Sequence, residues 1–100
     1  MNIEFHTEEP GEVNKWLITD LKKKLAQYGD DSKKITGASV YFNRNPNAEA
    51  GSYTCVIVLS GFGHSIMVQR SAGSYPTAAG EVIEELSNMV RELTEKELVN

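Results

Sequence analysis

Hydrophobic and polar residues alternate in three short segments of the chain, as they do in β-strands that have one buried face. In residues 2–6, Ile3 and Phe5 point to one side and the polar residues between them point to the other. The other two alternating segments are residues 35–43 and 64–71. Segment 52–60 is rich in β-branched residues, and the glycines on both sides of Phe62 predict a tight hairpin to the segment after it. The sequence therefore predicts four strands.

Two longer segments follow the period of an amphipathic helix instead. Residues 12–28 place an apolar side chain every three or four positions, at Val13, Leu17, Leu21, Leu25 and Tyr28. Gly29 stands where a glycine often ends a helix, so we expect the first helix to stop there. Residues 76–98 carry a second stripe, formed by Ala79, Val82, Ile83, Leu86, Met89, Val90 and Leu93. Ser74 is a suitable N-cap for this second helix.

The predicted order β-α-β-β-β-α restricts the topology. The first strand, the helix and the second strand form a crossover unit, whose two strands should be parallel. The short connections after the second and third strands imply antiparallel neighbours. Each helix has one apolar stripe, so the simplest arrangement is an α+β fold with both helices packed on one face of a four-stranded mixed sheet. The other sheet face is then exposed and carries Asn2, Glu4 and His6.

Length and composition fit one globular domain, residues 1–100. A chain of 100 residues, 40% apolar and 24% charged, can bury a core without metal or disulfide support. Cys55 is the only cysteine, which excludes a disulfide within the chain. No secretory signal is visible, and the longest unbroken apolar stretch, residues 55–59, is too short to cross a bilayer. We therefore expect a cytoplasmic protein with no membrane partner.

The residues that could carry catalysis or bind a metal are few and scattered. Cys55 lies inside a predicted strand, where a lone cysteine is usually a small buried hydrophobe. His6 and His64 are 58 positions apart, and neither has a further His or Cys at ligand spacing. The glutamates of the last helix fit a solvated face better than an acid–base pair, which needs a pocket. We expect no enzyme activity, no cofactor, no metal and no small-molecule substrate.

The net charge of −4 argues against a strongly basic nucleic-acid binder, but the charges are unevenly distributed. Seven of the ten cations lie in residues 15–44. Lys15, Lys22 and Lys23 line the arc of the first helix opposite its apolar stripe, and Trp16 lies on the same line as Lys23. Lysines beside an accessible indole are a combination that RNA-binding surfaces use. The alternative is that the lysines only solvate the helix and that the indole is tucked against the sheet edge. For Trp16 we expect the tucked position, because large aromatic residues are mostly buried.

Several local strings, together with the order of elements, resemble one bacterial family over essentially the whole chain. These strings are residues 2–7 (NIEFHT), 21–25 (LKKKL) and 38–41 (ASVY), and the start of the last helix with Tyr75, Ala78, Ala79, Leu86 and Leu93. On these residues the chain resembles the short form of the ribosome-associated inhibitors and hibernation-promoting factors, also called sigma 54 modulation proteins. The strings are patterned core and turn residues, so the resemblance is one of overall layout.

The resemblance implies a fold like that of double-stranded RNA-binding domains and docking in the decoding region of the small ribosomal subunit. A protein bound there would block the mRNA and tRNA sites and hold ribosomes idle under stress or in stationary phase. Basic side chains on both helices of the family contact ribosomal RNA; the matching residues here are Lys22, Lys23, Lys24, Arg91 and Lys96. Lys15 joins this set through its place on the helix face alone.

The last helix departs from the family pattern, which is usually basic there. It carries Glu81, Glu84, Glu92 and Glu95 around Arg91. Each missing phosphate contact weakens RNA affinity. This difference favours an alternative hypothesis, a diverged member that binds a protein partner through the exposed sheet face or the acidic helix and does not bind ribosomes.

Overall fold

The computed structural model describes residues 2–7, 13, 15–31, 34–44, 52–61 and 63–99 of the chain. Its elements are β1 (Asn2–Thr7), α1 (Lys15–Asp31), β2 (Ile35–Arg44), β3 (Tyr53–Gly61), β4 (His64–Ala72) and α2 (Tyr75–Val99). The predicted order β-α-β-β-β-α is therefore confirmed. Over the residues described, neither helix offers a stretch apolar enough to span a bilayer.

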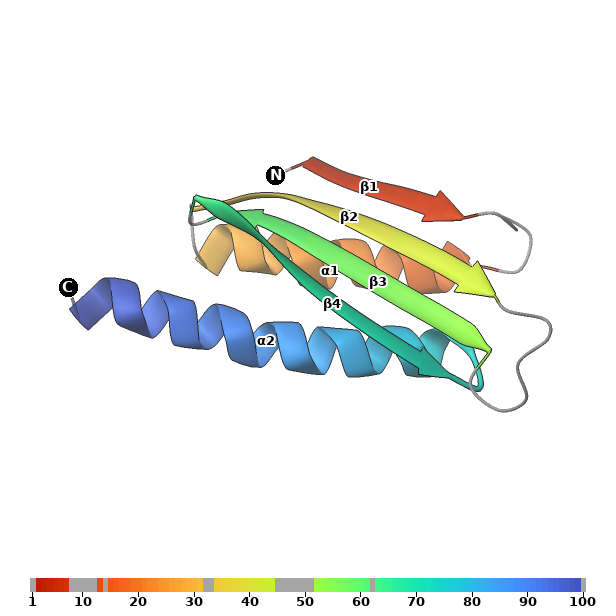
Figure 1. The fold of residues 1–100 in the computed structure, drawn as a ribbon. Helices are drawn as coiled ribbons and strands as arrows, with labels where there is room; N and C mark the ends of the chain where they lie inside the picture. The colour runs from red at the N-terminus through yellow and green to blue at the C-terminus, as the bar shows by residue number, and fades with distance from the viewer. Residues whose placement is uncertain are drawn as a thin grey trace.

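The four strands form one mixed sheet in the order β1-β2-β3-β4. β1 runs parallel to β2, with Phe5 beside Val40, and the two later pairs are antiparallel. β3 and β4 form a hairpin that aligns Gly61 with His64. Both helices lie side by side on one face of the sheet and leave the other face open, as Figure 1 shows. This is the predicted α+β architecture.

The core fills the space between the helices and the covered face of the sheet. It takes the inward residues of every element, the buried ones being Val13, Leu17, Leu21, Leu25, Tyr28, Ile35, Ala38, Val40, Phe42, Cys55, Ile57, Leu59, Ile66, Val68, Tyr75, Ala78, Ala79, Val82, Leu86 and Val90. At one end, the ring of Tyr75 meets those of Phe42 and Tyr53 edge-on, with centroids 5.3 and 4.9 Å apart. The period-two pattern thus predicted the inward side of β1, β2 and β4 correctly, and the period-3.6 pattern that of both helices.

The first helix ends later than Gly29, so the predicted cap there is wrong. α1 continues to Asp31, while its predicted start at residue 12 lies outside the described residues. Tyr28 holds the last turns against α2, because its ring is buried and its hydroxyl shares a 2.6 Å hydrogen bond with Ser87 Oγ. Burial raises the pKa of Tyr28, which keeps this hydroxyl protonated. This packing outweighs the cost of about 1 kcal/mol for a glycine inside a helix.

The second helix begins as predicted. Ser74 Oγ accepts a 3.3 Å hydrogen bond from the backbone N–H of Thr77, and the carbonyl of Ser74 accepts a 3.1 Å bond from the N–H of Ala78. Ser74 is therefore the N-cap of α2, and it fixes where Tyr75 and Pro76 enter the helix. α2 then runs past the ends of the strands in Figure 1, and Val90 is the last buried residue among those whose side chains the structure describes.

Two glycines provide a matched test of the packing. A Cβ on Gly61 would lie 2.6 Å from the carbonyl oxygen of Lys34 and 2.8 Å from Cα of Ile35, whereas a Cβ on Gly80 meets nothing within 4 Å. Gly61→Ala is expected to lower the free energy of unfolding by about 1–3 kcal/mol, since backbone atoms must move apart. Gly80→Ala is expected to raise it by about 0.5–1 kcal/mol through helix propensity. Urea unfolding of both variants measures this difference, and equal effects would contradict the packing described.

Candidate nucleic-acid interface

The lysines of α1 spread around the helix and do not form one row. Lys15, Lys22, Lys23 and Lys24 are all exposed. Because successive residues of an α-helix turn by about 100°, Lys22 and Lys24 point in directions about 200° apart. Lys22 leans toward β1, with Nζ 5.8 Å from the centroid of the Phe5 ring. Lys15, Lys22 and Lys23 therefore form the outward surface of α1, and Lys24 turns toward α2.

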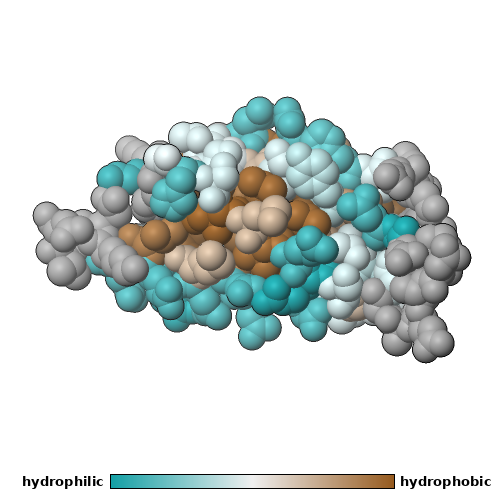
Figure 2. Space-filling model, in the orientation of Figure 1, coloured by the Kyte–Doolittle hydropathy of each residue, from teal (hydrophilic) through white to brown (hydrophobic). Residues whose placement is uncertain are grey.

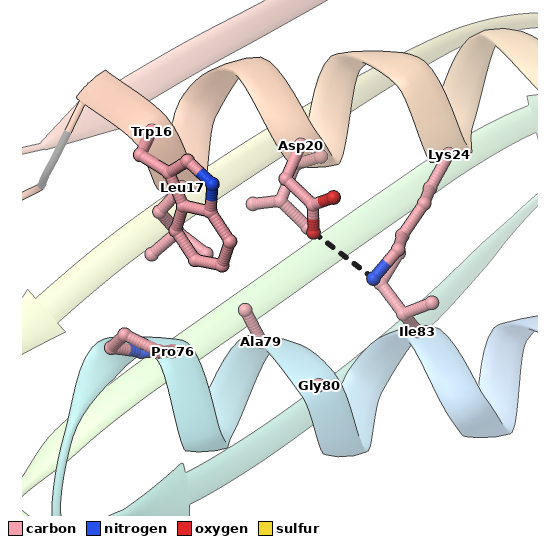
Figure 3. A pocket seen from close by; sticks show the side chains of 9 residues that line it. Trp16, Leu17, Asp20, Lys24, Pro76, Ala79, Gly80 and Ile83 are labelled. Carbon is pink, nitrogen blue, oxygen red and sulfur yellow. Dashed lines mark ion pairs between the residues drawn. The ribbon is translucent and has the colours of Figure 1, made fainter.

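The expectation that Trp16 tucks against the sheet edge is wrong. Its side chain is 65% exposed and stands at the side of α1 that faces α2. Figure 3 shows the indole extending from α1 toward Pro76 and Ala79. Ile18, on the opposite side of α1, packs against the core instead. The structure contains the alternative, an accessible indole near exposed lysines.

Trp16 forms one wall of a groove between the two helices. The groove has a volume of about 150 Å³ and is lined by Trp16, Leu17, Asp20, Leu21, Lys24, Pro76, Ala79, Gly80 and Ile83. Asp20 and Lys24 form an ion pair at 3.0 Å along the α1 wall, drawn as the dashed line in Figure 3. The side chains from α2 are small or apolar. We call this space the Trp16 groove.

A second, wider groove of about 440 Å³ follows along the same pair of helices. It is lined by Gln27, Tyr28, Ser87, Val90, Arg91, Thr94 and Glu95. Arg91 is exposed there, and its Nη2 donates a 2.7 Å hydrogen bond to Asn88 Oδ1. The structure thus brings Arg91 to the side of α2 that faces α1. Lys96 belongs to α2, but its side chain lies outside the described residues.

The acidic side chains of α2 gather mainly on its other flank, toward β4. Glu81, Glu84 and Glu85 line a separate hollow of about 310 Å³ together with Arg70 and Asn88. Arg70, on β4, forms an ion pair with Glu85. The side of α2 that lines the Trp16 groove is uncharged. A helical wheel of α2 would have revealed this separation, which the count of glutamates alone conceals.

The open face of the sheet is a second candidate surface, of different character. Among the described residues on it, Glu4 is the one carboxylate, and it lies 3.6 Å from His6 Nε2. The His6 ring stacks on Tyr41 with centroids 4.8 Å apart. Met67 on β4 is 63% exposed, and Figure 2 shows hydrophobic residues gathered in the middle of this face. Its described outward residues include no lysine or arginine, so this face lacks the cations that a polyanion needs.

The possible catalytic residues are not assembled into a site. Cys55 is fully buried, and burial raises the pKa of its thiol to about 12. His6 lies on the open face of the sheet, whereas His64 begins β4 in register with Gly61. Within the part of the chain that the structure describes, no three His, Cys, Asp or Glu side chains come close enough to hold a metal ion.

No family model and no curated protein matches this sequence. Several solved structures match the fold, among them the following two. One is a ribosomal subunit interface protein from Coxiella burnetii, with a TM-score of 0.76, 14% identity and coverage of 95% of this chain and 99% of that one. The other is the N-terminal domain of Thermus thermophilus Protein Y, with a TM-score of 0.72, 17% identity and coverage of 93% and 99%. The layout that prompted the family resemblance is therefore confirmed as a fold that this chain shares with both proteins over nearly its whole length.

Proposed function

We propose that this protein is a cytoplasmic ribosome-associated factor that binds ribosomal RNA of the small subunit and silences ribosomes under stress or in stationary phase. The observation that carries the proposal is the surface of α1, where Lys15, Lys22 and Lys23 are exposed beside the exposed indole of Trp16. The fold shared with a ribosomal subunit interface protein supports it. The mode of action proposed is occlusion of a binding site, which needs no catalytic group and no cofactor.

The distribution of charge explains how a protein of net charge −4 can bind a polyanion. The described cations of α1 point outward or toward α2, whereas Glu81, Glu84 and Glu85 lie on the β4 flank of α2. RNA that approaches α1 therefore meets ammonium groups first, and the nearest part of α2 is uncharged. Each lysine that neutralises a phosphate releases condensed counterions, which drives binding.

The remaining candidate residues extend this surface along the helix pair. Lys24 and Arg91 line successive grooves between α1 and α2. Their side chains already have polar partners, Asp20 and Asn88, so a phosphate would compete with these contacts. We assign Lys15, Lys22 and Lys23 the main phosphate contacts and Lys24 and Arg91 a supporting role. Lys96, on the last turns of α2, completes the proposed set.

Co-sedimentation with purified small ribosomal subunits tests the proposal. Binding is expected to weaken steeply between about 50 and 200 mM salt, because counterion release makes the affinity fall with the logarithm of salt concentration. Two results would count against the proposal. One is a sucrose gradient of stationary-phase cells in which the ribosomal particles do not carry the protein. The other is binding whose affinity does not change with salt concentration. Recovery of one stoichiometric protein partner without ribosomal RNA would instead favour the alternative, docking of a protein on the open sheet face around Met67 and Tyr41 or on the acidic flank of α2.

A further inference from the structure

We propose that the Trp16 groove receives a single unstacked RNA base, which the indole stacks on and which the Asp20–Lys24 pair recognises by its edge. The inference rests on the proposed function for the class of ligand, RNA. It goes further in assigning a base-recognition subsite, because the proposed function itself requires contacts to phosphate alone. Phosphate contacts give affinity without reading bases, whereas a base held in a groove adds selectivity for single-stranded or bulged RNA.

The position of Trp16 suits stacking. An indole that stabilises a fold is usually covered, but this side chain is 65% exposed on a helix whose neighbours Leu17 and Leu21 are nearly fully buried. Its ring extends over the space between the helices, as Figure 3 shows. Stacking of a base on such a ring contributes about 1–3 kcal/mol in proteins that bind single strands.

The opposite wall leaves room for a flat ligand. Pro76, Ala79 and Gly80 face the indole from α2, and none of them has a long side chain. A Cβ built on Gly80 would have no atom within 4 Å, so the space above this position is open. Ile83 closes the groove at the end near Lys24. A base inserted here would lie between an aromatic face and an apolar helix surface.

The Asp20–Lys24 pair supplies the polar groups that a base edge needs. The two groups are 3.0 Å apart, with side chains 33% and 49% exposed, so they are partly shielded but reachable. A carboxylate accepts hydrogen bonds at both oxygens, and an ammonium group donates. Guanine fits this pair best, since two neighbouring N–H groups of its edge can donate to Asp20 while O6 accepts from Lys24. We therefore expect guanine to be preferred over uracil.

The charges around the groove favour a nucleic-acid strand over a peptide. Lys23 lies two helical turns from Trp16 on the same side of α1, at a position where it can pair with the phosphate of a flanking nucleotide. No charged side chain comes from the α2 wall. The apolar floor and the cationic approach together match a base attached to a phosphodiester chain.

Trp16 is the only tryptophan of the chain, so its fluorescence reports on this groove alone. The probes are three eight-nucleotide RNAs: oligouridine, the same with one central guanosine, and the same with a central abasic ribose. Stacking should quench the fluorescence, most strongly with the guanosine probe and least with the abasic one. Equal quenching by the guanosine and abasic probes would overturn the inference.

Variants measured with fluorescein-labelled probes by anisotropy complete the test. Trp16→Ala should weaken binding of the guanosine probe about 5- to 150-fold, and Trp16→Phe should retain most of the affinity. Gly80→Leu should fill the groove and abolish the difference between the guanosine and abasic probes. The matched control is Met67→Ala, which removes an apolar side chain of similar exposure, 63%, from the open sheet face and should change nothing.

The outcomes separate this inference from the proposed function. If Trp16→Ala and Gly80→Leu bind small subunits and all three probes with unchanged, salt-dependent affinity, the base subsite is wrong and the ribosome proposal stands. If the wild-type protein binds neither the probes nor the small subunit, both are wrong. A loss of subunit binding on Trp16→Ala that is rescued by Trp16→Phe supports both.

Discussion

Replacing Lys15, Lys22 and Lys23 together by glutamine is expected to weaken binding to the small ribosomal subunit by roughly ten- to a hundredfold near 100 mM salt. These three side chains are exposed and point away from the core, so each would form an exposed ion pair with phosphate, worth on the order of 0.5–1 kcal/mol. The dependence on salt should change as well. Three lost phosphate contacts lower the slope of log affinity against log salt by about two to three.

The matched control changes the net charge by the same amount on the other face of the molecule. Ser65, Met67 and Gln69 are exposed on β4 and point to the open side of the sheet. Replacing these three by glutamate also adds three units of negative charge, but away from the proposed interface. If the lysine variant and this control lose affinity equally, the protein responds to its net charge alone and the assignment of α1 as the interface is wrong.

The fold could be predicted from the sequence because most of its elements carry their own period. In β2 the residues Ala38, Val40 and Phe42 are all buried as the alternation predicts, whereas β3 was predicted from its β-branched residues and not from alternation. The chain order then leaves few topologies, since a β-α-β unit followed by two hairpin connections limits the sheet order. The end of α1 could not be predicted. A glycine at position 29 signals a helix end locally, but the burial of Tyr28 against α2 depends on a contact 59 residues away in the chain.

The candidate site could be predicted only as a list of residues. Composition and charge pointed to the lysines of α1, and all four proposed there are exposed. What the sequence could not show is how α1 and α2 lie against each other. Trp16 is exposed because the side of α1 on which it stands meets small residues of α2, and this pairing comes from the sheet that holds both helices. The general tendency of aromatic residues to be buried therefore does not hold for this indole.

The way in which α1 and α2 lie against each other also changes how the glutamates of α2 affect RNA binding. Counted along the sequence, the glutamates oppose RNA binding. In the structure, Arg70 pairs with Glu85 on the β4 flank, and Glu81 and Glu84 line the same hollow. The flank that lines the Trp16 groove stays neutral. Like charges repel RNA most where they approach it most closely, and exposed charges are screened beyond about 10 Å at 0.1 M salt. Glu81, Glu84 and Glu85 thus lie away from the proposed RNA surface of α1, whereas Glu95 stands beside Arg91 in the wider groove.

The second large effect concerns Cys55, whose thiol should make the protein lose stability in alkali. The side chain is fully buried between the sheet and the helices, and desolvation raises the pKa of the thiol from 9.0 to about 12. The unfolded chain therefore gives up this proton at lower pH than the folded one. The contribution of the protonated thiol to the free energy of unfolding is complete below about pH 9 and is lost as the pH rises toward 12. About 2–3 kcal/mol of it is lost by pH 11.

Urea unfolding of the wild type and of Cys55→Val at several pH values measures this effect. Lysine and tyrosine titrations are common to both proteins, so the difference between their free energies of unfolding isolates the thiol. Valine is similar in size to cysteine and does not ionise. The Cys55→Val variant should therefore become more stable relative to the wild type as the pH rises. A difference that stays flat with pH, or rapid alkylation of Cys55 in the folded protein at neutral pH, would show that the thiolate forms within the fold. That result would restore the nucleophile that the buried position argues against, and with it the case for an enzyme.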